Sequence, residues 1–128
     1  MKTGEKFNNC VIIDVNKESG KGIICSEFPM YWNQSLKFAG GANYKKAQRD
    51  IAKFKDNNFS DWRLPTQKEL ELMFKLKKKI LTFTSGFHMS CELDGDTKIF
   101  GTALDTGRQS STLITNECYI HPVREFEL

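Results

Sequence analysis

The spacing of apolar and polar residues changes along this chain and divides it into three parts. Apolar runs rich in β-branched residues at 10–15 (CVIIDV) and 22–28 (GIICSEF) flank the polar segment NKESGK, which contains a glycine. This pattern predicts a β-hairpin with a loop of four to six residues. The following stretch, 28–42, is irregular because a proline and a pair of glycines interrupt it.

Two amphipathic helices are predicted in the middle of the chain. The segment 43–55 predicts the first, with Asn43 as its N-cap. Apolar residues recur along one face of this segment, at Tyr44, Ala47, Ile51 and Phe54. The second helix starts at Thr66, where Thr66 and Glu69 form a T-x-x-E capping box, and we expect it to end near Lys79. Its apolar arc covers about half of the helix, and lysines dominate the other side.

Strand-like segments return after residue 80. They cover 80–93, 97–104 and 118–128, and the polar segments DGD, DTGRQSS and TNE separate them. A hairpin, two helices and then antiparallel strands, in that order, are typical of an α+β fold rather than a parallel doubly wound sheet. The length of 128 residues fits one domain spanning residues 1–128.

The stretch SDWRLPTQKELELMF, residues 60–74, places a tryptophan, an arginine and a proline directly before the second helix. Trp62 brings a large apolar surface with one N–H donor, and Arg63 brings five donors. We expect a structural corner in which Arg63 pairs with a carboxylate or with loop carbonyls; direct contact with a ligand is the alternative. The motif comprises Asp61, Trp62, Arg63, Leu64, Pro65, Thr66 and Glu69.

This motif carries a family resemblance. DWRLPTQKELELM resembles the D-W-R-L-P-T-x-x-E-L signature of the Lcl C-terminal domain family, whose bacterial members end collagen-like adhesins and many surface proteins. VIIDVNKESGKGIICSEF resembles the family's opening hairpin, FHMSCE its Tyr-Trp-Ser-Ser-x-Glu strand and YIHPVREF its closing Val-Arg-Pro-Val-Arg strand. The family is similar to the formylglycine-generating sulfatase-modifying fold, so the resemblance implies a C-type-lectin-like fold.

The resemblance also implies a function. It indicates a non-enzymatic binding domain, similar to adhesins, that contacts a glycan or protein ligand through long loops and outer strands. The residues expected on this ligand surface are His88, Glu92, Asp94, Asp96, Arg108, His121 and Arg124. His88, Met89 and His121 depart from the residues common in the family. The alternative is an intracellular protein-interaction module that derives from a phage or mobile element.

An enzyme that depends on a cysteine or a metal is a third hypothesis. The sulfatase-modifying enzymes carry a second cysteine five residues after the position of Cys118, and Val123 stands there in this chain. We therefore expect no such activity and no catalytic residue. A lone Cys118 nucleophile with His121 or His88 as its base is the alternative.

The four cysteines leave several arrangements open. Cys10, Cys25, Cys91 and Cys118 are expected to be free thiols in the cytoplasm, whereas a secreted chain could form two disulfides. His-x-x-Cys at 88–91 and Cys-x-x-His at 118–121 resemble zinc ligands. Residues i and i+3 of a strand point to opposite faces, so we expect no metal. Two ligands per face, one from each strand, is one alternative, and a cross-strand Cys91–Cys118 contact or disulfide is another.

A loop with three carboxylates is the other candidate for cation binding. Glu92, Asp94 and Asp96 in ELDGDTK could hold a hard cation, but a polar hairpin turn is the preferred interpretation. We expect no cofactor.

The net charge of the chain gives little information about its binding partners. Nineteen lysines and arginines against sixteen acidic residues give a net charge of +3, a weak bias that does not favour nucleic acid. The lysines of the second helix form either a solvated face or an anion-binding face suited to sulfated glycans: Lys68, Lys75, Lys78 and Lys79.

From the sequence we expect neither a membrane-spanning run nor a secretory signal at residues 1–10. No apolar run approaches the roughly 18–20 residues that a membrane span needs. The segment MKTGEKFNNC has no apolar core of a secretory signal, so a cytoplasmic location is expected, or a surface location if a leader has been removed.

Overall fold

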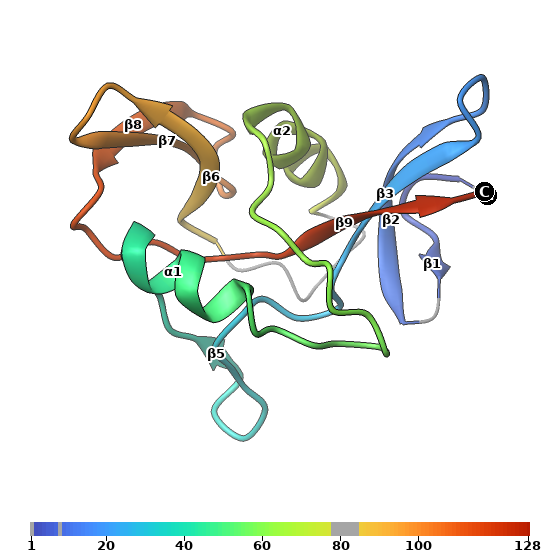
Figure 1. Ribbon diagram of the computed structural model, residues 1–128, viewed down its shortest axis with the longest axis horizontal. Helices are drawn as coiled ribbons and strands as arrows, with labels where there is room; N and C mark the ends of the chain where they lie inside the picture. The colour runs from blue at the N-terminus through green and yellow to red at the C-terminus, as the bar shows by residue number, and fades with distance from the viewer. Residues whose placement is uncertain (1, 8, 78–84) are drawn as a thin grey trace.

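A computed structural model describes residues 2–7, 9–77 and 85–128 (Figure 1). Within these residues the chain forms two helices and three antiparallel sheets, which confirms the α+β fold class. The first sheet has the strand order β1-β2-β3-β9. Its strands are β1 (Lys6–Phe7), β2 (Cys10–Asn16), β3 (Lys21–Cys25) and β9 (Val123–Glu127). The predicted opening hairpin is β2 and β3, which pair antiparallel with a bulge between Ile12 and Asp14.

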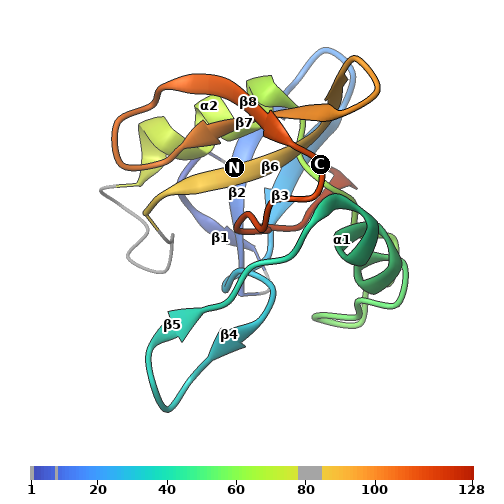
Figure 2. The same ribbon diagram turned by 90° about the vertical axis from the view of Figure 1, so that its left-hand side faces the viewer.

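The second half of the chain forms a three-stranded sheet. Its strands are β6 (Phe87–Asp94), β7 (Lys98–Ala103) and β8 (Gln109–Leu113), in that order. A separate short hairpin pairs β4 (Trp32–Asn33) with β5 (Phe38–Ala39), inside the stretch predicted to be irregular. Figure 2 shows this hairpin projecting from the rest of the chain at the bottom of the view.

Both predicted helices form, with the predicted N-caps. α1 (Tyr44–Ile51) begins after Asn43, whose side chain accepts a hydrogen bond from the backbone N–H of Lys46. It ends four residues before the predicted boundary, because tighter i→i+3 hydrogen bonds replace the helical ones at residues 53 and 54. α2 (Gln67–Leu76) begins with the predicted capping box; its predicted end near Lys79 lies outside the described residues.

Helix α2 lies between the two larger sheets in Figure 1 and contacts β2, β6 and β7. Its apolar side chains Leu70 and Met73 are fully buried. They pack with residues from the first sheet and from the β7–β8 connection: Val11, Ile13, Cys25, Val123 and Leu104. The helix therefore joins the two halves of the chain through its apolar face.

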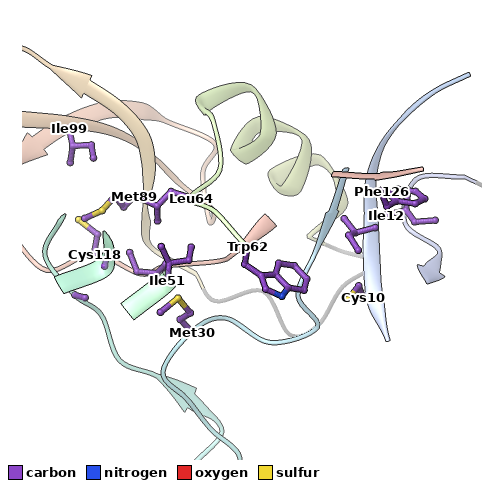
Figure 3. Close-up of a cluster of buried hydrophobic side chains, with 14 residues drawn as sticks. Cys10, Ile12, Met30, Ile51, Trp62, Leu64, Met89, Ile99, Cys118 and Phe126 are labelled. Atoms are coloured by element: carbon purple, nitrogen blue, oxygen red, sulfur yellow. The ribbon is translucent and has the colours of Figure 1, made fainter. Parts of the chain in front are cut away.

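A second buried cluster extends across the molecule and includes Trp62 (Figure 3). It joins α1, through Ala47 and Ile51, to Met30 in the loop after β3 and to strands of both large sheets. The loop that leads from α1 to α2 is thus anchored at its centre by the Trp62 side chain.

Two strand predictions were wrong in detail. β8 covers Gln109–Leu113, but we had assigned Gln109, Ser110 and Ser111 to a polar connection between strands. β8 pairs with β7 alone and forms an edge of its sheet, where exposed polar residues are tolerated. The segment 118–128 is not one strand. Only Val123–Glu127 forms β9, because Pro122 lacks a backbone N–H donor, and the residues before it make isolated bridges instead. The part of the predicted strand at 80–84 lies outside the described residues.

Candidate functional site

The DWRLPT motif forms a packed corner before α2. Trp62 is 5% exposed, and its indole N–H donates to the backbone carbonyls of Phe59 at 3.1 Å and Asp56 at 3.3 Å. The backbone of Arg63 exchanges two hydrogen bonds with Val123, of 2.9 and 3.0 Å, which ties this corner to the start of β9. Leu64 is also buried. The motif places its largest side chain in the core, with the indole donor satisfied.

The Arg63 side chain pairs with a carboxylate, as predicted. Its two terminal nitrogens donate to the two oxygens of Glu69 at 2.8 and 2.9 Å, and one also donates to the Leu64 carbonyl. Glu69 also accepts the backbone N–H of Thr66 at 2.9 Å in the capping box. Burial raises the pKa of Glu69, but the hydrogen bonds from Arg63 and Thr66 outweigh burial and hold this pKa below its usual value. These donors and acceptors are occupied within the corner.

A second arginine fork lies beside the corner. Arg124 on β9 donates to Asp61 at 2.6 and 3.1 Å, and its guanidinium stacks on the Phe59 ring at 3.7 Å. The Arg124 hydrogen bond lowers the pKa of Asp61. Arg124 is therefore only partly available as the ligand contact expected from the sequence, although it lines an open hollow of about 460 Å³ with Phe59 and Phe126.

Both histidines expected on the ligand surface are buried, so that assignment was wrong for them. His88 and His121 are each 0% exposed. One ring nitrogen of His88 contacts the Gly86 carbonyl at 2.9 Å, and one of His121 contacts the Ser26 carbonyl at 2.7 Å. Burial lowers the pKa of His88 to about 3 and that of His121 to about 4. His88 is turned inward by the alternation of side chains along β6, whereas His121 lies in the segment before β9, where its ring contacts the Ser26 carbonyl inside the core.

The four cysteines are free thiols. Cys10, Cys25 and Cys118 are buried, and Cys91 is exposed on β6. Burial raises the pKa of Cys118 to about 11, which suppresses the thiolate that a nucleophile needs. Within residues 2–7, 9–77 and 85–128, no group of three or more His, Cys, Asp or Glu side chains could hold a metal ion.

Two of the three carboxylates at residues 92–96 accept hydrogen bonds from other parts of the chain. Glu92 accepts the backbone N–H of Gln67, the first residue of α2, at 2.5 Å, and Asp94 accepts the Ser111 hydroxyl at 2.7 Å. Asp96 lies exposed in the turn, and Arg108 lies exposed before β8. The three carboxylates serve the helix start, a cross-strand contact and a turn, in keeping with the hairpin interpretation.

The lysines of α2 are described in part. Lys68 and Lys75 are exposed, and Lys75 pairs with Glu71 at 3.5 Å. Lys78 and Lys79 lie outside the described residues. An acidic neighbour on the same face weakens an anion-binding role for Lys75.

An open hollow of about 420 Å³ lies where the loop after β3 meets the loop after α1. In Figure 1 these two segments, light blue and green, run beside each other below the centre of the view. We call this hollow the aromatic hollow; it is lined by Asn9, Glu27, Phe28, Pro29, Met30, Tyr31, Trp32, Phe54, Asp56 and Asn57. The rings of Phe28 and Trp32 are stacked, with centroids 5.3 Å apart and planes inclined at 16°.

Three non-glycine residues that line the aromatic hollow have left-handed backbone conformations. Their φ angles are +69° at Asn9, +63° at Tyr31 and +54° at Asn57. Asparagine tolerates this conformation, but it is unusual for a tyrosine and costs free energy. Two side-chain contacts hold Tyr31 in this backbone conformation. Its hydroxyl donates to Asp50 of α1 at 2.5 Å, and the Lys46 ammonium lies 4.5 Å from the centre of its ring. Strained residues of this kind concentrate at binding sites.

The sequence did not single out the aromatic hollow. The one sequence signal was the cluster FPMYWN, which places three aromatic residues close together in a segment without a periodic pattern. The acidic partner Asp56 comes from a loop more than twenty residues away, so only the folded chain brings the two loops together.

Comparison with known proteins adds no assignment: no protein-family model matches the chain, and no curated protein matches it significantly. In the part of the chain that the structure describes, neither helix has the length and apolar character to cross a membrane.

Proposed function

We propose that this chain is a non-enzymatic binding domain of C-type-lectin-like fold, and that its ligand is a glycan held in the aromatic hollow. The observation that carries the proposal is the set of side chains there: aromatic faces together with carboxylate and amide groups, on two loops braced by buried residues. A concave site that combines apolar faces with a few polar groups is the usual form of a small-ligand site.

The chemistry of the aromatic hollow suits a sugar ring. Aromatic faces pack against the C–H faces of a pyranose, and the stacked pair of Phe28 and Trp32 offers such a surface. The Asp56 carboxylate can accept hydrogen bonds from hydroxyls, and the amide of Asn9 can donate and accept. The Trp32 indole is held in place by its N–H, which donates to Gln34 at 2.9 Å.

Sequence resemblance and element order support the fold assignment. The DWRLPT corner, the opening hairpin and the closing strand occur in the order of the Lcl C-terminal domain family, and β9 returns to pair with β3 of the opening hairpin. Cys118 is buried and its pKa is raised, and both observations support the proposal that it has no catalytic role.

An array of neutral, amino and sulfated glycans, probed at physiological salt, tests the proposal. We expect binding by the wild-type chain, its loss in Trp32→Ala, and its retention in Phe38→Ala. Phe38 is a matched control because it is an exposed aromatic residue, 54% accessible, outside the aromatic hollow. Absence of binding to every glycan, or equal binding by Trp32→Ala, would contradict the proposal.

A second candidate is a protein-interaction module that uses the β4–β5 hairpin. Leu36 and Phe38 on this hairpin are 65% and 54% exposed, and the hairpin projects from the chain (Figure 2). Exposed apolar residues that lie together are typical of protein contacts. Loss of a protein partner in Leu36→Ser and Phe38→Ser, with glycan binding absent, would favour this candidate. Fractionation of native cells adds an independent check, because a surface location would count against an intracellular module.

A further inference from the structure

We propose that the outer edge of β8 binds a second copy of this chain. The two β8 strands pair antiparallel about a two-fold axis and join two three-stranded sheets into one continuous sheet. The proposal comes from the backbone directions and the side chains of Gln109–Leu113, and it does not depend on the glycan function. Figure 2 shows this sheet at the front of the view, with β8 beside β7.

The two edges of this sheet differ in what covers them. Outside β6, the backbone of Tyr119 bonds to Phe87 and Met89, each at 3.0 Å. Further along β6, the N–H of Cys91 donates to the Pro65 carbonyl at 2.8 Å. In the described part of the chain, β8 pairs with β7 alone. The sheet therefore has one edge that the chain covers itself and one that it leaves open.

Backbone hydrogen bonds at both ends of β8 show which of its groups face the open side. The N–H of Ile114 donates to the Thr97 carbonyl at 2.9 Å, and the N–H of Ala103 donates to the Arg108 carbonyl at 2.9 Å. In an antiparallel pair, successive residues direct their backbone groups alternately toward the neighbouring strand and away from it. The residues that direct their backbone N–H and C=O away from β7 are therefore Gln109, Ser111 and Leu113.

These outward groups are available to a partner strand. Among residues 2–7, 9–77 and 85–128, none accepts a hydrogen bond from the backbone N–H of Gln109, Ser111 or Leu113. The Leu113 carbonyl accepts the N–H of Asn116 at 3.0 Å and keeps a second lone pair. When two Ser111 residues face each other across the axis, they exchange both bonds of a hydrogen-bonded pair. Gln109 then lies opposite Leu113 of the second copy and pairs with it in the same way.

The side chains of β8 are complementary to themselves in this register. Ser111 lies opposite Ser111, and Ser110 lies opposite Thr112 of the second copy. Cross-strand pairs of hydroxyl residues are favourable in sheets. All five residues of β8 are uncharged, so no like charges meet. Leu113, which is 48% exposed, gains the neighbouring Gln109 side chain as cover. These pairs favour a second copy of this chain as the occupant.

Strand β9 shows an open edge that is protected against the same pairing. Arg63 exchanges backbone bonds with Val123, so by the same alternation the backbone groups of Glu125 and Glu127 point outward beyond it. A second β9 paired with these groups would place glutamate opposite glutamate, and like charges directly opposite are destabilising. Charge, proline and bulges are the usual protections of an edge strand. β8 contains neither charge nor proline, and its register with β7 is unbroken.

Sedimentation equilibrium together with hydrogen exchange tests the proposal. Over an about 100-fold range of protein concentration, we expect the mass to rise from monomer toward dimer. A strand edge is a small interface, so we expect association mainly at the upper end of the range. The amides of Gln109, Ser111 and Leu113 should become protected from exchange as the dimer forms. Those of Ser110 and Thr112, which bond to β7, should be protected at every concentration.

Variants at one position separate the backbone edge from the side chain. Ser111→Pro removes an outward N–H and keeps the bonds to β7, so the dissociation constant should rise about 10-fold or more. Ser111→Ala loses the hydroxyl bond to Asp94, of 2.7 Å, but keeps the N–H and should still associate. Ser111→Glu places glutamate opposite glutamate and should weaken association without changing the backbone. Unfolding curves in dilute solution, where the chain is monomeric, check that each variant is folded.

Each outcome decides the proposal. Alternating protection along β8, with association weakened in Ser111→Pro and Ser111→Glu and retained in Ser111→Ala, supports the interface. A wild-type chain that stays monomeric over the whole range overturns it. Dimers that form equally in wild type and in folded Ser111→Pro or Ser111→Glu also overturn it, because they use another surface. Protection that rises at Glu125 and Glu127 instead would assign the interface to β9.

Discussion

Replacing Glu69 by alanine removes the carboxylate on which the DWRLPT corner depends. Glu69 accepts both terminal nitrogens of Arg63, at 2.8 and 2.9 Å, and the backbone N–H of Thr66 at 2.9 Å. Glu69→Ala leaves the guanidinium with the Leu64 carbonyl as its remaining partner and leaves the Thr66 donor unpaired. The change therefore tests whether the motif is structural.

The expected cost follows from exposure. Breaking a fully buried ion pair costs about 3–5 kcal/mol. The Glu69 side chain is 10% exposed but that of Arg63 is 39% exposed, so water reduces this cost to roughly half. The lost acceptor in the capping box adds about 1 kcal/mol. We expect the free energy of unfolding to fall by about 2.5–3.5 kcal/mol, and Tm to fall by about 10–14 °C.

Urea denaturation followed by tryptophan fluorescence measures this change. Glu71→Ala is the matched control on the same helix: Glu71 pairs with Lys75 at 3.5 Å, both side chains are more than half exposed, and the expected loss is about 0.5 kcal/mol or less. A double-mutant cycle with Arg63→Ala isolates the pair itself. If Glu69→Ala costs no more than Glu71→Ala, the structural interpretation of the motif is wrong.

Three further changes test the packing and the ionisation of the core. Lowering the pH from 7 to 5 should reduce the free energy of unfolding by about 2 kcal/mol for each of His88 and His121. In the unfolded chain each imidazole gains a proton near pH 6.5, whereas in the folded chain His88 stays neutral down to about pH 3 and His121 down to about pH 4. Urea denaturation at both pH values measures this change, and an unchanged free energy of unfolding would contradict the burial of the two rings. Gly101→Ala should destabilise the chain by several kcal/mol, since its Cβ would lie 2.2 Å from the His88 carbonyl oxygen, whereas Gly40→Ala has no neighbour nearer than 3.8 Å; equal melting temperatures would refute this steric argument. Titration of native protein with a thiol reagent should modify Cys91 before the buried cysteines, and mass spectrometry that found another thiol reacting first would show that the burial is wrong.

The sequence predicted those features that local physics determines. The capping box at Thr66, the N-cap at Asn43 and the β2–β3 hairpin each depend on residues within a few positions of one another, and all three form as predicted. The pairing of Arg63 with a carboxylate was predicted as well, because a guanidinium beside a buried tryptophan needs an acceptor.

Features that depend on distant segments were not predictable. The burial of His88 depends on which face of β6 meets the core, and a single bulge reverses it. His121 lies in an irregular segment before β9, whose path is set by contacts with distant residues. The aromatic hollow needs Trp32 and Asp56 from separate loops, and neither loop has a periodic pattern. Strand β8 was missed because its serines and threonine read as a polar connection, whereas an edge strand accepts them.

One titration tests whether the ligand binds at the aromatic hollow while the DWRLPT motif has a structural role. Backbone amide chemical shifts of the ¹⁵N-labelled chain are followed as a glycan that binds on the array is added. We expect the largest shifts at residues 27–32 and 54–57, around the aromatic hollow, and small shifts at the start of α2. Shifts concentrated at 61–69, at the β6–β7 turn or along the lysine face of α2 would contradict both the binding role of the aromatic hollow and the structural role of the motif.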